Sequence, residues 1–287
     1  MSTSKFSTDS IKTSDGITLR YISTGLADGP TLLFIPGWAQ TAIQWYKQIV
    51  HFSTDFRVLA IDHRGQGDSD QAASGYRISR LAADLHDFIT QLDLKNAVLI
   101  GHSMGCSIIW SLWNTYAASR SRIAKLVLVD QSPVMVADPA WEDRLARDVG
   151  AVFSPVAVYE IAAGLATPDG VNVGAGLLKN LFSPIVSEAD FTWTLQQVTK
   201  MEMKNAATLF LNHAGQDWRD VLSTITVPTL VVGGELSIFG SGAMEWVARQ
   251  IPGAKLKIFG KDEGGSHFMF WENAEGFNEA LYGFLKD

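Results

Sequence analysis

The sequence contains very little cysteine and no long apolar run. Its 287 residues include a single cysteine, Cys106, which excludes an intramolecular disulfide and a cysteine-based zinc site. No stretch comes near the roughly 18 uninterrupted apolar residues of a membrane-spanning helix, so we expect no membrane association. The polar start, Met1–Ser10, lacks the apolar region of a secretory signal. We therefore expect a frayed N-terminal tail and a cytoplasmic protein.

Charge is also sparse, at 18% of the residues, and no run of charges is basic. The 23 Lys and Arg against 30 Asp and Glu give a net charge of −7. Binding to nucleic acid needs clustered Lys and Arg, so we expect no nucleic-acid partner. Neither metal-ligand spacing nor a glycine-rich nucleotide motif is present, which predicts no metal and no cofactor. We expect a small-molecule substrate, and the sequence leaves the oligomeric state open, a homodimer included.

Short apolar runs alternate with amphipathic stretches along most of the chain. Strands are predicted at Ile17–Ser23, Thr31–Pro36, Val58–Ile61, Ala97–Ile100, Leu126–Val129, Pro228–Val232 and Lys255–Phe259. Helical periodicity marks Ile78–Leu92, Ser103–Tyr116, Gly242–Gln250 and Ala274–Leu285. Continuously apolar strands are typical of a sheet that is covered on both faces. The alternation predicts an α/β fold, with a mostly parallel sheet flanked by helices.

One long segment interrupts this alternation. Between Pro133 and Asp220 no strand pattern is present, and the segment is too long to be a plain connection. It predicts a helical cap at residues 134–218, inserted into a core made of residues 1–133 and 219–287. We expect most aromatic residues of the cap to form its own small core and a few to face a pocket beneath it.

The motif Gly101-His102-Ser103-Met104-Gly105 stands between the predicted strand at Ala97–Ile100 and the helix that follows. A G-x-S-x-G sequence in this context predicts a tight strand-to-helix turn that exposes the serine. Side chains at positions 101 and 105 would collide with the neighbouring strand and helix. The helix N-terminus also favours negative charge that develops near Ser103. We interpret Ser103 as a nucleophile.

The chain resembles the α/β-hydrolase superfamily from about residue 13 to residue 286. The matching segments are Pro36-Gly37-Trp38, Asp62-His63-Arg64-Gly65-Gln66-Gly67-Asp68-Ser69, the serine motif and Gly264-Gly265-Ser266-His267-Phe268. It is most similar to small bacterial and fungal members filed as esterases or non-haem chloroperoxidases. The resemblance implies an eight-stranded, mostly parallel sheet with a helical cap. It also implies that the Asp62–Ser69 loop is structural, and we expect Arg64 to pair with a nearby acid.

The chain order of this superfamily places a histidine base on the loop after the last strand, which here is His267. The acid is less clearly marked. Superfamily members usually carry it on the turn after the strand predicted at Pro228–Val232, where this chain has Ser237. Asp130, at the end of another strand, is the favoured acid, because some members take it from that position. Glu235 is the alternative.

The resemblance also implies an oxyanion hole built from the backbone N–H groups of Trp38 and Met104. The first segment usually reads His-Gly, whereas here a proline precedes Gly37 and leaves the backbone donor available. We expect the substrate pocket to include Trp38, Gln40, His102 and Trp193.

These residues predict a serine hydrolase that cleaves a small carboxylic ester, lactone or related acyl substrate through an acyl-enzyme on Ser103. A second reading is a cofactor-free dioxygenase of the same superfamily, acting on a hydroxyquinolone-like heteroaromatic with His267 as base. Those enzymes share the Pro-Gly-Trp segment and the Asp130 position, but they carry a histidine where this chain has Gln40. A third reading is a binder of the hormone-receptor type on the same fold, which the intact serine and histidine disfavour.

Overall fold

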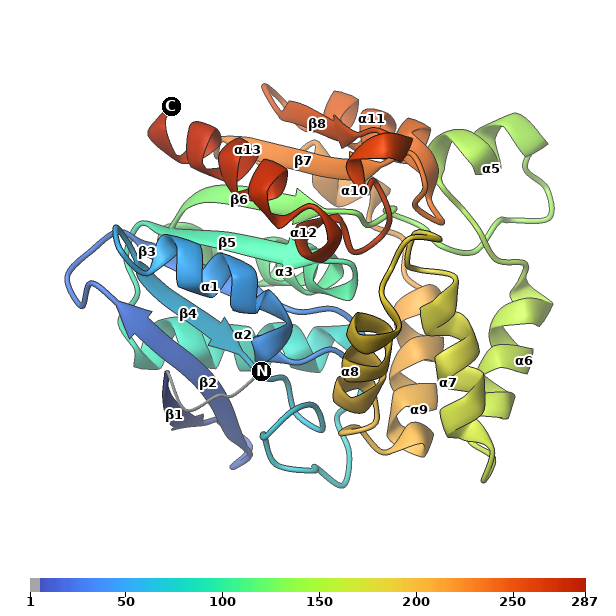
Figure 1. Cartoon of the computed structure of the whole chain (residues 1–287), viewed down its shortest axis with the longest axis horizontal. Coiled ribbons are helices and arrows are strands. Elements are labelled where there is room, and N and C mark those ends of the chain that lie inside the picture. The colour runs from blue at the N-terminus through green and yellow to red at the C-terminus, as the bar shows by residue number, and fades with distance from the viewer. Residues whose placement is uncertain (1–5) are drawn as a thin grey trace.

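A computed structural model describes residues 6–287 as a twisted sheet covered by helices (Figure 1). The eight strands follow the order β1-β2-β4-β3-β5-β6-β7-β8. The pairs β1·β2 and β2·β4 are antiparallel, and the other five pairs are parallel. The predicted α/β class and mostly parallel sheet are therefore confirmed.

The strands have the apolar content that their places in the sheet require. Their bounds are β1 Ser7–Lys12, β2 Thr18–Gly25, β3 Thr31–Ile35, β4 Arg57–Ile61, β5 Ala97–His102, β6 Ile123–Val129, β7 Thr229–Gly234 and β8 Lys255–Phe259. Every residue of the central strands β3 and β5 is buried, as expected for strands covered on both faces.

The edge strand β1 was not predicted from the sequence. The frayed tail was expected over Met1–Ser10, of which residues 1–5 lie outside the described part. Residues from Ser7 onward pair with β2, so the expectation is wrong there. Only Ile11 of this strand is buried, and an edge strand facing solvent on both sides has no apolar alternation by which to recognise it.

Two sets of helices cover the two faces of the sheet, with α1, α12 and α13 on one face and α2 and α3 on the other (Figure 1). Their bounds are α1 Tyr46–Phe52, α2 Ile78–Gln91, α3 Met104–Thr115, α4 Ala117–Arg120, α11 Gly240–Gln250, α12 Met269–Glu272 and α13 Ala274–Lys286. Short 3-10 turns occupy Ala42–Trp45 and Lys261–Glu263. The four predicted helices are confirmed to within two residues at each end. Within residues 6–287, no helix has both the length and the apolar composition needed to cross a membrane.

The chain between β6 and β7 forms further helices and, among its described residues, no strand. They are α5 Asp143–Val149, α6 Pro155–Leu165, α7 Gly170–Lys179, α8 Glu188–Val198, α9 Met203–Ala214 and α10 Arg219–Leu222. The name cap is used for residues 134–218 of this segment. An isolated antiparallel bridge joins Val134 to Asp217, near the two predicted ends of the insertion. In Figure 1, α7, α8 and α9 stand together beyond the carboxyl ends of the central strands. Helices α6 and α9 share a small apolar cluster that includes Val158, Leu165 and Phe210.

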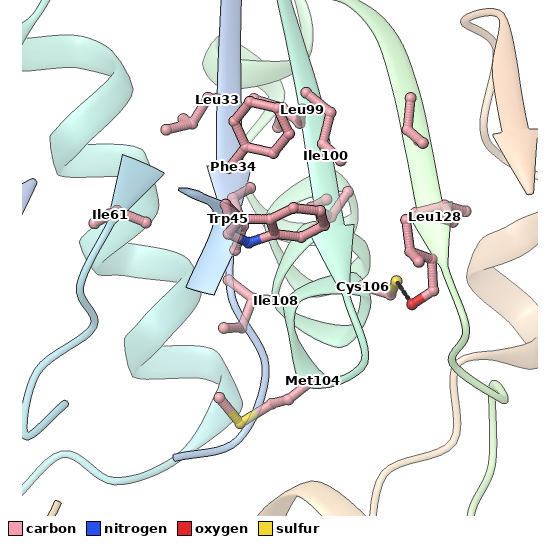
Figure 2. Packing of buried hydrophobic residues seen from close by; sticks show 14 of the residues in the cluster. Leu33, Phe34, Trp45, Ile61, Leu99, Ile100, Met104, Cys106, Ile108 and Leu128 are labelled. Atoms are coloured by element: carbon pink, nitrogen blue, oxygen red, sulfur yellow. Dashed lines mark hydrogen bonds between the residues drawn. The ribbon is translucent and has the colours of Figure 1, made fainter. Parts of the chain in front are cut away.

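Helix α3 packs tightly against the centre of the sheet (Figure 2). Met104, Cys106 and Ile108 are fully buried there. A Cβ atom on Gly105 would lie 2.3 Å from the carbonyl oxygen of Ile35 in β3, so the helix can approach this closely only with glycine. The Cys106 thiol donates to a backbone oxygen 3.1 Å away, and burial raises its pKa. This is the environment of a structural rather than a reactive cysteine.

The loop from Asp62 to Ser69 is organised by buried charges. Both oxygens of Asp62 accept backbone N–H groups, at 2.7 and 3.0 Å. Arg64 is almost fully buried and forms ion pairs with Asp84 at 2.6 Å and with Asp15 at 2.9 Å. The expected pairing of Arg64 is confirmed, and the loop is held by contacts within the protein.

The close approach of α3 to β3 predicts that Gly105→Ala is destabilising. The added methyl group would overlap a backbone oxygen that cannot rotate away, so we expect a loss of about 3 kcal/mol or more in the free energy of unfolding. Gly283→Ala is the matched control, because that exposed helical position has no atom within 4 Å of the new Cβ. It should stabilise by about 0.5–1 kcal/mol. Urea unfolding of both variants checks this, and a Gly105→Ala protein as stable as the control would contradict it.

Candidate active site

Ser103 occupies the sharp turn between β5 and α3. Its backbone has φ +53° and ψ −124°, a conformation that costs energy for a residue with a side chain. Its N–H donates to the Val129 oxygen at 2.8 Å, so the turn is tied to β6. A Cβ on Gly101 would lie 2.7 Å from Ile109, and Gly105 is equally confined. The predicted role of these glycines in avoiding collisions is confirmed.

His267 and Asp130 form a buried pair beside this turn. His267 Nδ1 lies 2.6 Å from Asp130 Oδ2, and the two residues are 2% and 0% exposed. A carboxylate can only accept, so Nδ1 carries the proton and Nε2 is left as the basic nitrogen. Asp130 follows β6, and its own N–H continues the sheet by donating to Val232 at 2.8 Å. Its φ of +52° is strained, as at Ser103.

The structure brings Asp130, and not Glu235, to the histidine. Glu235 is exposed, and its carboxylate accepts the backbone N–H of Lys261 at 3.1 Å. Ser237, at the usual superfamily position of the acid, instead donates its hydroxyl to Asp130 Oδ2 at 2.5 Å. The sequence marked Ser237 as a departure from the pattern but could not predict this contact, because the two residues are far apart in the chain.

The turn after β3 lies directly against the serine. A Cβ on Gly37 would come within 3.0 Å of Ser103 Cβ, which places the backbone of the Pro36–Trp38 turn beside the serine side chain. Met104 is the first residue of α3, and the first N–H groups of a helix have no acceptor within it. The two segments expected to donate to an oxyanion therefore flank Ser103 on either side.

Two of the residues expected to form the pocket support this turn. Gln40 is buried, lines the pocket, and accepts the Gly37 N–H through Oε1 at 2.6 Å. His102 was expected in the pocket wall, and this is wrong. Its ring is fully buried behind the wall, with Nδ1 2.9 Å from Gln40 Oε1 and Nε2 2.8 Å from the His267 carbonyl. Burial holds the pKa of His102 well below its usual value, so the neutral ring donates to one of these oxygens.

The two tryptophans differ in the same way. Trp38 lines the pocket, donates from Nε1 to the Ala206 carbonyl in α9 at 2.8 Å, and packs edge-on against Phe210. Trp193 does not line the pocket, which corrects the prediction. It stacks on Trp271 of α12 with ring centres 4.7 Å apart, because α8 turns that face toward the core rather than toward the serine.

Ser103 and His267 open into one apolar pocket of about 250 Å³ under the cap. Apolar side chains from both the core and the cap make up most of its wall: Trp38, Met135, Val152, Phe153, Leu177, Leu178, Leu181, Val198, Phe210, Ile238, Phe239 and Phe268. Beyond Gln40, the remaining polar members are Asn180, which is exposed, and the buried His213. Such a site suits a compact apolar ligand held by few polar contacts.

The cap is fastened to the loop that carries the base. The His267 N–H donates to the Leu181 carbonyl at 3.1 Å. Glu272 accepts hydrogen bonds from the hydroxyls of Ser183 on the cap side and Ser266 on the loop side. The position of the imidazole thus depends on contacts with the cap as well as on Asp130.

His213 lines the pocket but was not predicted as a pocket residue from the sequence. It lies in the last turn of α9, and burial lowers its pKa to about 3. Its spacing of three residues from Phe210 was the available signal, because residues three apart share a helix face. Among the described residues, no three His, Cys, Asp or Glu side chains gather in a way that could hold a metal ion.

Comparison with known proteins agrees with this geometry. A family model described as the alpha/beta hydrolase fold matches residues 30–274. A non-heme chloroperoxidase from Streptomyces lividans is 32% identical over 283 residues, covering 96% of this chain and 99% of that protein. A bromoperoxidase from Bacillus anthracis superposes with a TM-score of 0.87 at 25% identity, covering 98% of this chain and all of that one.

A second similar structure is Est816, described as an N-acyl homoserine lactone degrading enzyme, with a TM-score of 0.77 and 25% identity. The match covers 96% of this chain and 100% of that one. Because the family model spans most of the sequence and the Streptomyces protein aligns along nearly its whole length, the chain belongs to the α/β-hydrolase fold family.

Proposed function

We propose that this enzyme is a serine hydrolase that cleaves a small carboxylic ester or lactone through an acyl-enzyme on Ser103. The observation that carries the proposal is the buried 2.6 Å hydrogen bond from His267 Nδ1 to Asp130, beside a serine on a strained turn that faces the same pocket. A serine hydroxyl needs a neighbouring base to become nucleophilic, and this arrangement provides one.

The reaction follows from the chemistry of these groups. His267 Nε2 takes the hydroxyl proton as Ser103 Oγ attacks the ester carbonyl, and Asp130 stabilises the imidazolium that forms. The backbone N–H groups of Trp38 and Met104 donate to the oxyanion. His267 then protonates the leaving alcohol oxygen, and the carbonyl–oxygen bond breaks to leave the acyl-enzyme. Water, deprotonated by the same nitrogen, attacks this ester and releases the acid and the free serine.

The pocket supports a compact and largely apolar acyl group. Its volume of about 250 Å³ and its aromatic wall leave no room for a polymer chain. A lactone as substrate is supported by the similarity to Est816, which is described as an N-acyl homoserine lactone degrading enzyme, and another similar protein is a non-heme chloroperoxidase. Attack of hydrogen peroxide on the acyl-enzyme in place of water would release a peracid, so the same site could also support perhydrolysis as a side reaction.

A cofactor-free dioxygenase is the second candidate, because the acid at the end of β6 and the Pro36–Trp38 turn beside Ser103 fit it as well. There His267 would deprotonate a hydroxyquinolone-like substrate, which then reacts with O2. The buried Gln40 stands where those enzymes have a histidine, and its oxygen already accepts the Gly37 N–H. The hydrolase remains the function that we propose.

The two candidates differ in their dependence on the serine. For the hydrolase, Ser103→Ala should lower kcat for short p-nitrophenyl esters by about 10⁴-fold or more, and His267→Ala should be equally damaging. For the dioxygenase, oxygen uptake with a hydroxyquinolone should be lost in His267→Ala and only weakened in Ser103→Ala. Ester hydrolysis that survives in a folded Ser103→Ala protein would contradict the proposal.

The geometry also predicts which carboxylate matters. Asp130→Asn removes the acceptor that orients Nδ1–H and should lower kcat by about 10²- to 10⁴-fold with little change in KM. Glu235→Gln is the matched control, because that exposed side chain contacts the Lys261 backbone and should leave kcat within about twofold. The reverse ranking in steady-state ester kinetics would show that Asp130 is not the acid.

A further inference from the structure

The wall of the pocket contains one buried polar side chain that the proposed reaction does not use. His213 lies in the last turn of α9, is 4% exposed, and shares its helix face with Phe210, which also lines the pocket. The reaction requires Ser103, His267, Asp130 and two backbone N–H groups, and none of its steps passes through His213.

The ring of His213 has an unsatisfied nitrogen. Several buried side-chain atoms in residues 6–287 have no hydrogen-bond partner within the protein, and the Nδ1 atom of His213 is one of them. Among these atoms, it is the one that belongs to a side chain of the pocket wall. None of the other atoms belongs to a residue that lines the pocket. Nδ1 is itself enclosed, whereas Nε2 is not among the enclosed atoms without a partner, so Nε2 is the ring nitrogen that a ligand in the pocket can reach. A buried polar side chain without a partner is unfavourable unless a ligand or water supplies one.

The charge state of His213 restricts what it can bind. Burial is the main cause that lowers its pKa to about 3, and the nearby His267 lowers it further. No carboxylate is among the causes of this shift, so the ring is neutral at neutral pH. A neutral imidazole donates through one nitrogen and accepts through the other. It therefore matches an uncharged hydroxyl or carbonyl oxygen, and it has no positive charge to attract an anion.

The other polar groups of the wall are placed differently. Gln40 Oε1 is already bonded to the Gly37 N–H and lies against the buried His102 ring. Asn180 is exposed, so it remains in contact with solvent. His213 is therefore a buried polar side chain in a mainly apolar wall, where it can form a hydrogen bond to a polar substituent on an apolar acyl group.

We propose that His213 is a specificity-determining residue that hydrogen-bonds an uncharged oxygen substituent, hydroxyl or keto, on the apolar acyl group of the substrate. The inference rests on the proposed ester hydrolysis and narrows its substrate class to hydroxy- or oxo-acyl esters and lactones. Binding of the substituent fixes the acyl group in the pocket while its carbonyl carbon faces Ser103. A site built to hydrogen-bond a substrate oxygen discriminates strongly against the analogue that lacks it.

The test compares p-nitrophenyl hexanoate with its 3-hydroxy, 3-oxo, 4-oxo and 5-oxo derivatives. The wild type should hydrolyse at least one substituted ester with a kcat/KM about tenfold or more above that of the plain ester. His213→Leu should remove this preference by lowering kcat/KM for the substituted ester only. His213→Gln, which keeps a hydrogen-bonding group near the position of Nε2, should retain part of it. The preferred derivative identifies whether the imidazole hydrogen-bonds a hydroxyl or a keto oxygen, and on which carbon of the acyl group.

Phe210→Leu is the matched control, because it alters the same helix face and the same wall without changing a polar atom. It should change kcat/KM for plain and substituted esters alike. A wild type that hydrolyses the plain ester but prefers no derivative would overturn the role of His213 and leave the hydrolase proposal intact. An equal loss on all esters in His213→Leu would overturn it too, since that is the effect of a purely structural residue. Wild type inactive on every ester would instead contradict the hydrolase proposal itself.

Discussion

The hydrogen bond between His267 and Asp130 is the interaction on which the rest of this site depends. It joins the loop after β8 to the end of β6, and both partners are almost completely buried. The sheet fixes the positions of Asp130 and of Ser103, the nucleophile that the pair serves. The N–H of Asp130 continues the pairing of β6 with β7, and the N–H of Ser103 continues that of β5 with β6. Because adjacent parallel strands end at the same edge, nucleophile, base and acid meet at one place.

This placement requires strain in the backbone. Of the five residues other than glycine with positive φ in the described chain, Ala39, Ser103 and Asp130 lie at this edge of the sheet. Such conformations persist only where the surroundings hold them, and here the tight packing of α3 and the bonds of the central strands do so. The cap adds a second set of restraints, since Leu181 and Glu272 connect it to the His267 loop. The pocket, the base and the cap are thus parts of one connected structure.

Much of this could be predicted from the sequence, because the information was local. Ser103 is marked by its glycines and by the strand and helix on either side, and His267 by its place after the last strand. The choice between Asp130 and Glu235 depended on which carboxylate the folded sheet brings to the imidazole, and that carboxylate is Asp130, whereas Glu235 accepts the Lys261 N–H. The distance between each carboxylate and the imidazole is set by the folded sheet and cannot be predicted from a pattern along the chain.

The predictions about pocket residues that were wrong failed because they depended on the folded arrangement. Trp193 and His102 were assigned to the pocket by residue type and neighbourhood, but the direction of a side chain decides whether it lines a cavity. Trp193 turns toward Trp271, and His102 lies beneath the wall. His213 was missed for the converse reason, because the packing of α9 over the serine turns an unremarkable histidine inward. The strand β1 is recognisable only by its pairing with β2, since its side chains are exposed.

Activation of Ser103 by His267 and Asp130 can be measured by intact-protein mass spectrometry after incubation with a fluorophosphonate, followed by peptide mapping. A single adduct on Ser103 should form rapidly in the wild type, slowly in Asp130→Asn, and not at all in Ser103→Ala. A folded wild type that forms no adduct, or forms one on another residue, would show that Ser103 is not the activated nucleophile.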